Sequence, residues 1–237
     1  MVCCTFPAFG TDTVEGGKSA AFGTETDAVY QYLWRGISYN RGLMTQPSAW
    51  LSRGDFTLST WCNFTLYDFD KAVKQHEVDL TAQYDLSFGD FVVTPSINIY
   101  FYPNQTRAPT TGELAFGGSY FLESWEFFTN QFVDFIEYRG AYYGEIGFGY
   151  SFPVKATNTL SAGLNLGWSS GKFNAAYNGM SQSTLSSLVL NCSYNFKLTE
   201  SVSVQPHAEL FRNLNSSLRK INHTNLFNFG ILFTIGA

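Results

Sequence analysis

Ionisable side chains recur two residues apart in several segments of the chain. Glu77 and Asp79 form one such pair, and His207 and Glu209 form another. Successive residues of a β-strand point to opposite faces, so a spacing of two puts both side chains of a pair on one face. Rows of acids on one face can attract cations, and an arginine enclosed among them, such as Arg35, needs an acidic partner.

The remaining residues give little indication of a catalytic site. Ser203 and His207 share a face, but four strand residues separate them by about 13 Å, which is too far for a hydrogen bond between nucleophile and base. The four cysteines include no C-x-x-C spacing of the kind that marks zinc or redox sites. We therefore expect no enzyme, no metal site and no cofactor, and rank a lipid-modifying enzyme of the outer membrane as the least favoured alternative.

The elements that position these side chains are predicted to be β-strands. In residues 159–170, Leu160, Ala162 and Leu164 share one face, while Ser161 and Asn165 lie on the other. The same alternation recurs along the chain and predicts twelve strands. Their ranges are 28–38, 44–52, 55–67, 76–88, 91–102, 112–122, 125–136, 141–152, 159–170, 184–196, 201–212 and 225–236.

Composition indicates whether these strands lie in water or in a membrane. Only 14% of residues are charged, against about 25% in soluble domains, and 18% are aromatic. No stretch approaches the roughly 20 apolar residues of a transmembrane helix. The polar faces carry Ser, Asn, Thr and Gly rather than Lys and Glu, which disfavours a soluble lipocalin-like barrel. The sequence predicts an all-β fold, a closed antiparallel transmembrane β-barrel of about twelve strands in an up-and-down meander.

The predicted connections alternate between short and long, as in outer-membrane barrels with tight periplasmic turns and longer outer loops. An even strand number then places both termini in the periplasm. Aromatic residues cluster near strand ends and suggest interfacial girdles, namely Tyr30, Tyr32, Trp34, Tyr100, Tyr102, Tyr142, Tyr143, Tyr150 and Phe152. Residues 1–27 are interpreted as a tail that combines a signal-peptide remnant with a periplasmic segment, and residues 28–237 as the barrel.

Three segments carry a family resemblance. They are YLWRGISYNRGLMTQ (Tyr32–Gln46), the hairpin His76–Pro103, and YYGEIGFGYSFPV (Tyr142–Val154). In this order and spacing the chain resembles the TorF-like porin family of bacterial outer-membrane β-barrels, from about residue 28 onward. The resemblance implies a twelve-stranded barrel.

If the apolar face meets lipid, the opposite face lines the interior. The residues predicted to line a pore are Arg35, Trp50, Trp61, Asp79, Glu113, Glu145, His207 and Glu209. Arg35 either orients a solute at a constriction or holds the interior together by pairing with acids on neighbouring strands, and the second role is favoured. Trp50 and Trp61 are expected to take up interior space.

These residues predict a small passive pore for small cationic or neutral solutes in the bacterial outer membrane. The alternative is a structural or adhesive barrel with a closed interior, whose outer loops 171–183 and 213–224 carry the function. Expected partners are outer-membrane lipid and small solutes. Nucleic acid is not expected, because the net charge is −5 and no basic cluster is present.

Overall fold

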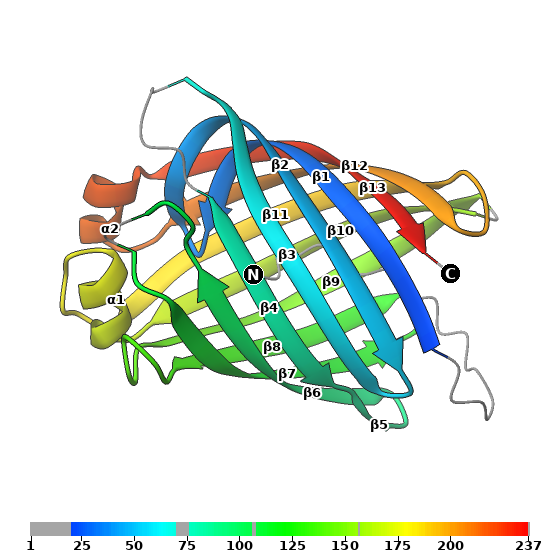
Figure 1. Cartoon of the computed structure of the whole chain (residues 1–237), viewed down its shortest axis with the longest axis horizontal. Helices are drawn as coiled ribbons and strands as arrows, with labels where there is room; N and C mark the ends of the chain where they lie inside the picture. Colours follow the sequence, from blue (N-terminus) through cyan, green and yellow to red (C-terminus); the bar gives the residue numbers. More distant parts are fainter. Residues whose placement is uncertain (1–19, 70–75, 106–107, 156, 237) are drawn as a thin grey trace.

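The computed structural model describes residues 20–69, 76–105, 108–155 and 157–236. These residues form a closed antiparallel β-barrel of twelve strands (Figure 1). The labels reach β13 because β4 and β5 are two parts of one strand, interrupted at Asp85, and both pair with β6. The elements are β1 (Ala20–Trp34), β2 (Ile37–Arg53), β3 (Phe56–Asp68), β4 (Glu77–Tyr84), β5 (Leu86–Phe88), β6 (Phe91–Phe101), β7 (Thr111–Leu122), β8 (Trp125–Asp134), β9 (Tyr142–Lys155), β10 (Asn158–Ser169), α1 (Gly171–Tyr177), β11 (Thr184–Lys197), β12 (Val202–Asn213), α2 (Ser216–Asn222) and β13 (Asn225–Gly236).

Each strand pairs with the next along the chain, and β1 pairs with β13 to close the ring. The closing register runs from Gly23 opposite Gly236 to Val29 opposite Gly230. The predicted fold class, an up-and-down barrel of twelve strands, is therefore confirmed. In the part of the chain that the structure describes, no helix has the length and apolar character needed to cross a membrane.

The barrel has two unlike ends. The start of β1 and the end of β13 lie at the end closed by the tight connections, which we call the turn end. The opposite end carries the longer connections together with α1 and α2 (Figure 1), and we call it the loop end. Ser170 caps α1 by accepting a hydrogen bond from the Phe173 amide, and Asn215 caps α2 by accepting from Ser217 and Leu218. Both helices lie in segments that the sequence analysis treated as loops.

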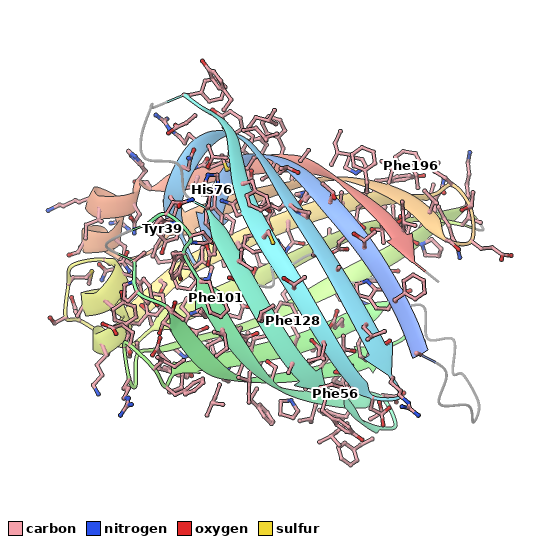
Figure 2. All side chains as sticks on the ribbon, viewed as in Figure 1. Tyr39, Phe56, His76, Phe101, Phe128 and Phe196 are labelled. Atoms are coloured by element: carbon pink, nitrogen blue, oxygen red, sulfur yellow. The ribbon has the colours of Figure 1, made fainter. Side chains whose placement is uncertain are left out.

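The two faces of the barrel wall differ in polarity. On the outer face, Leu58, Leu114 and Leu190 are 49%, 50% and 53% exposed. On the inner face, Asn63 and Glu113 are 0% and 1% exposed. Figure 2 shows Phe56 and Phe196 near the turn end, and both side chains are exposed. The usual order of a soluble protein is inverted here, because apolar side chains cover the outside and polar side chains fill the inside.

The first two strands differ most from their predicted ranges. The strand predicted at 28–38 is β1 and begins at Ala20, so residues 20–27, which were assigned to the tail, form its first half. The strand predicted at 44–52 is β2, which covers Ile37–Arg53 and includes residues that were expected to form a loop. Residues 20–27 were missed because one face carries small and polar side chains instead of large apolar ones. The rest of the predicted tail, residues 1–19, lies outside the described residues.

The predicted aromatic girdle is wrong at Tyr32, Trp34, Tyr100 and Tyr143, whose side chains are packed inside the barrel. The pairing of β1 with β2 shifts register between Val29 and Gln31 and again between Tyr32 and Leu33. Pairing of β1 with β13 ends at Val29, so the residues that follow leave the wall, and Gln31, Tyr32 and Leu33 are all buried although they lie on alternate faces. Tyr32 is therefore 3% exposed and turned into the barrel, whereas Tyr150 and Phe152 remain on the outer face as predicted.

Candidate functional site

A hairpin at the loop end leaves the barrel wall and enters the interior. Pairing of β1 with β13 ends at Val29, and pairing of β2 with β3 begins at Gly42. Between them, residues Gln31–Asn40, which we call the inner hairpin, pair among themselves and with Arg41, and with no other wall residue among those described. In Figure 1 the blue hairpin curls from the wall back into the barrel. Gly42 permits the departure, because its φ is +154° and a Cβ there would lie 1.9 Å from the Tyr67 carbonyl oxygen.

Arg35 lies at the tip of the inner hairpin with a φ of +52°. Its two terminal nitrogens, Nη1 and Nη2, each lie 2.7 Å from a carboxylate oxygen of Glu113 on β7, and both side chains are almost fully buried. The Tyr100 hydroxyl donates to Glu113 Oε2 at 2.7 Å. This is a bidentate ion pair, the strongest geometry available between these groups. Arg35 therefore has an acidic partner, but on a strand across the barrel and not on a neighbouring one.

Aromatic rings enclose the same guanidinium. The Arg35 Cζ atom lies 4.3 Å from the Phe132 ring centroid, 4.7 Å from Tyr143 and 5.6 Å from Phe173. Each distance is within the range of cation–π attraction. We call Glu113, Tyr100, Phe132, Tyr143 and Phe173 the Arg35 cage. Its members come from β7, β6, β8, β9 and α1.

The other side of the hairpin contacts the opposite wall. Leu33 packs in a buried cluster with Val189, Phe211 and Leu226 on β11, β12 and β13. Asn213 Nδ2 donates to the Gly36 carbonyl oxygen at 3.0 Å. The hairpin tip therefore touches β7 on one side and β11–β13 on the other, and it crosses the interior at the loop end.

Further contacts join the hairpin to β4 and to the helical loops. The Tyr32 hydroxyl bonds to the Glu77 carboxylate on β4. Trp34 meets the edge of Tyr177 in α1 at a centroid distance of 4.9 Å. Burial raises the pKa of the Tyr177 phenol well above its ordinary value, so this side chain is neutral and adds no charge. Asn222 in α2 donates to Asn178 after α1 at 2.6 Å and joins the two helical loops.

A second polar cluster lies on the turn-end side of the hairpin. His207 Nε2 on β12 is 3.0 and 2.9 Å from the two carboxylate oxygens of Asp27 on β1. Gly230 lies between them on β13, where a Cβ would come within 2.6 Å of His207 Nε2. Glycine therefore allows the imidazole to cross one strand and reach the next. Glu209 is buried on the same face of β12 as His207.

Glu145 joins three strands of the wall. Asn130 on β8 donates to Glu145 Oε1 at 3.0 Å, and Asn165 on β10 donates to Oε2 at 2.9 Å. In these two contacts amide groups donate to the buried carboxylate and link β8, β9 and β10.

The two tryptophans predicted to line a pore lie at different levels. Trp50 is half-buried at the turn end, and its indole passes over Gly23, where a Cβ would meet the ring at 2.5 Å. Trp61 packs against Tyr32 of the inner hairpin at a centroid distance of 5.9 Å. Asp79 is opposite Trp61 in the β3–β4 register and is 1% exposed. All eight residues predicted to line a pore are buried or partly buried on the inner side of the barrel.

Sequence reasoning missed Asp27 and Asp134. Asp27 fell in the presumed tail, although Glu25 and Asp27 already show a spacing of two. Asp134 lies near the end of β8, where its Oδ1 accepts from the Ile136 and Tyr138 amides at 3.0 and 2.9 Å. Only the turn that follows β8 gives Asp134 these partners, and no sequence pattern marked it.

Metal-binding clusters are absent from the described residues, where no group of three or more His, Cys, Asp or Glu could hold a metal ion. The His207 imidazole bonds to the Asp27 carboxylate. Cys192 is exposed on the outer face and Cys62 is half-buried, and neither forms a disulfide.

Comparison with protein-family models gives no match, and comparison with curated proteins gives none either. Solved structures do share the fold. The NanC porin matches with a TM-score of 0.61 at 11% identity, over 90% of this chain and 98% of that one. The KdgM porin matches with a TM-score of 0.56 at 9% identity, again over 90% and 98%. An outer membrane channel from Pseudomonas putida F1 matches at 0.50 and 12%, over 96% and 98%. At these identities the likeness shows the barrel fold alone.

Proposed function

We propose that the chain is an outer-membrane barrel of the porin type that passes small cationic or neutral solutes. The observation that carries this proposal is the inversion of polarity across the wall, with large apolar side chains outside and a buried acidic surface inside. The buried acids are Asp27, Glu77, Asp79, Glu113, Asp134, Glu145 and Glu209. Arg35 pairs with Glu113, and His207 pairs with Asp27.

Lipid is the environment that suits the outer face. An aqueous surface so rich in exposed Leu, Ile and Phe would aggregate, whereas a closed barrel leaves no unpaired strand edge in hydrocarbon. The solved structures of like fold are outer-membrane porins and channels, which supports the same placement. Assignment to the TorF-like family belongs to this proposal and rests on the three segments that resemble it.

The charge of the interior indicates which solutes could pass. One KdgM structure is a complex with disordered oligogalacturonate, an acidic sugar polymer. An acidic solute would meet Glu145 and Glu209 in the interior of the present barrel, where the low dielectric of the surroundings strengthens repulsion. The proposed solutes are therefore cationic or neutral. The loop end is proposed to face outward and both chain ends the periplasm.

The inner hairpin favours a second candidate, a barrel with a closed interior whose loops carry the function. Its tip crosses the interior at the loop end and is fixed on both sides. The two candidates make different predictions for ionic current.

The reversal potential in a planar bilayer under a KCl gradient tests the pore. We expect current that prefers K⁺, and a weaker preference when Glu145→Gln and Glu209→Gln are combined. Glu123→Gln, at an exposed turn between β7 and β8, is the matched control and should leave the preference unchanged. Current that prefers Cl⁻ would contradict the acidic-pore account, and absence of current from folded protein would favour the closed barrel.

A further inference from the structure

The Arg35 cage belongs to the wall, while its occupant belongs to the hairpin. The cage members hold one another without the help of Arg35. Tyr100 donates to Glu113 at 2.7 Å, and the Tyr143 and Phe173 rings lie 5.5 Å apart in a buried cluster. Phe173 is fixed in turn by the capped start of α1. Contacts that do not involve the guanidinium therefore help to hold the Glu113 carboxylate and the Tyr143 and Phe173 rings in place.

The inner hairpin is attached to the wall mainly by side chains. Apart from Arg41, no wall residue among those described pairs with Gln31–Asn40, and the two strands of the hairpin shift register twice against each other. Gly36 at the tip has a φ of +82°, and Gly42 at the base has a φ of +154°. Removal of the hairpin from the interior would break no strand pairing with the wall beyond Arg41 among the described residues, so its position depends on side-chain contacts such as the Arg35–Glu113 pair and the Leu33 cluster.

We propose that the Arg35 cage is a recognition site for solutes that carry a guanidinium group, and that Arg35 occupies it in the resting barrel. A solute guanidinium takes the place of Arg35, and the inner hairpin is released from Glu113. The inference rests on the proposed function, because release matters only if the interior conducts.

The chemistry of the cage selects a planar cation. Glu113 offers two oxygens in the plane that a guanidinium fork requires, and Phe132 and Tyr143 offer faces on which it stacks. An ammonium group is a compact point charge that cannot make both bonds in one plane. The cage should therefore prefer arginine over lysine.

Arg35 competes with any solute from within the same chain. A tethered group has an effective concentration in the millimolar range or above, so a free solute of equal affinity must reach comparable concentrations. Arg35→Gly removes the competitor, and glycine suits the positive φ at this position.

Calorimetric titration of the folded full-length chain in detergent tests the site directly. The probes are free arginine and free lysine at equal ionic strength. We expect Arg35→Gly to bind arginine saturably and at least about tenfold more tightly than lysine, on the basis of the lost planar pair. The wild type should bind arginine more weakly than Arg35→Gly. Arg35→Gly combined with Glu113→Gln should lose the preference for arginine.

Equal binding of arginine and lysine by Arg35→Gly would overturn the inference. A preference for arginine over lysine that persists in the double variant, Arg35→Gly with Glu113→Gln, would overturn it too. Should Arg35→Gly not fold, Arg35→Lys serves in its place. Lysine keeps the positive charge but lacks the planar pair of N–H donors that binds Glu113. It should bind arginine more tightly than the wild type does, and no gain in affinity would overturn the inference.

Planar-bilayer current separates this inference from the proposed function. Arginine should raise the current through the wild type, lysine should not, and Arg35→Gly should pass the higher current without a ligand. Current that is equal with and without arginine would overturn the inference and leave the pore intact. Absence of current from every form would overturn the pore, while the calorimetric preference for arginine would still hold.

Discussion

Arg35 and Glu113 form a bidentate ion pair across the barrel, with both nitrogen–oxygen distances at 2.7 Å. The two residues are 78 positions apart in the chain and lie on elements that share no backbone pairing. Their contact fixes the tip of the inner hairpin against the far wall. The pair therefore joins the hairpin that fills the loop end of the interior to the wall opposite β11–β13.

Glu113→Gln should destabilise the barrel strongly. The change leaves the buried guanidinium of Arg35 without its counter-charge, and breaking one side of a buried ion pair costs about 3–5 kcal/mol. Urea unfolding of the protein in lipid vesicles measures the loss. Glu126→Gln is the control, because Glu126 accepts one hydrogen bond from Ser119 at 2.8 Å and should lose only about 1 kcal/mol. Equal losses in the two variants would contradict the role given to the ion pair.

Gly230→Ala should be poorly tolerated. A Cβ at this position would lie 2.6 Å from His207 Nε2 and 2.7 Å from Val29 Cγ1, so the bond between His207 and Asp27 must shift. The expected loss is about 1–3 kcal/mol in the free energy of unfolding. Gly118→Ala is the matched control, because its nearest contact would be Thr129 Cγ2 at 3.7 Å. A stable Gly230→Ala barrel would show that the crossing of β13 by His207 is not needed.

Leu190→Arg tests whether the outer face lies in hydrocarbon. Leu190 is 53% exposed near the middle of β11, and an arginine at the bilayer midplane costs about 2–4 kcal/mol. Leu198→Arg, just beyond β11 at the turn end, is 62% exposed and should cost about 0–1 kcal/mol near the interface. Unfolding in vesicles measures both variants. A neutral Leu190→Arg would argue that water, not lipid, covers this face.

The wall of the barrel was predictable because strand periodicity alone decides it. Alternation separates Leu190 from Asn165 and Glu145, and the low content of charged residues decides that the Leu190 face is the outer one. The prediction failed where periodicity breaks. Beyond Val29 the chain leaves the wall, so alternation no longer decides which side chains face lipid, and Tyr32 and Trp34 lie inside.

The inner hairpin could not be predicted from the sequence. Arg35 was expected inside and in need of an acid, but alternation says only which face a residue occupies. It does not say that a hairpin leaves the wall. The partner, Glu113, is fixed by the closed barrel and by the folding-back of Gln31–Asn40, both of which are properties of the whole chain.

The proposed orientation predicts which end of the barrel is accessible on intact cells. Lys220→Cys in α2 at the loop end should react with a membrane-impermeant maleimide, while Glu123→Cys at the turn end should react only after lysis. Both changes belong in a cysteine-free form of the chain, because Cys192 is exposed. Labelling of Glu123→Cys on intact cells, with Lys220→Cys protected, would reverse the orientation.

Single-channel conductance of a barrel without the inner hairpin tests the central claim most directly. Residues Gln31–Asn40 would be replaced by a two-residue Asn-Gly turn, which suits a tight connection between antiparallel strands. The account predicts a large, K⁺-preferring conductance for the shortened barrel and a much smaller one for the wild type under the same conditions. A folded, shortened barrel that carries no current would contradict the pore, and equal conductance in the two proteins would contradict the role of the hairpin as its obstruction.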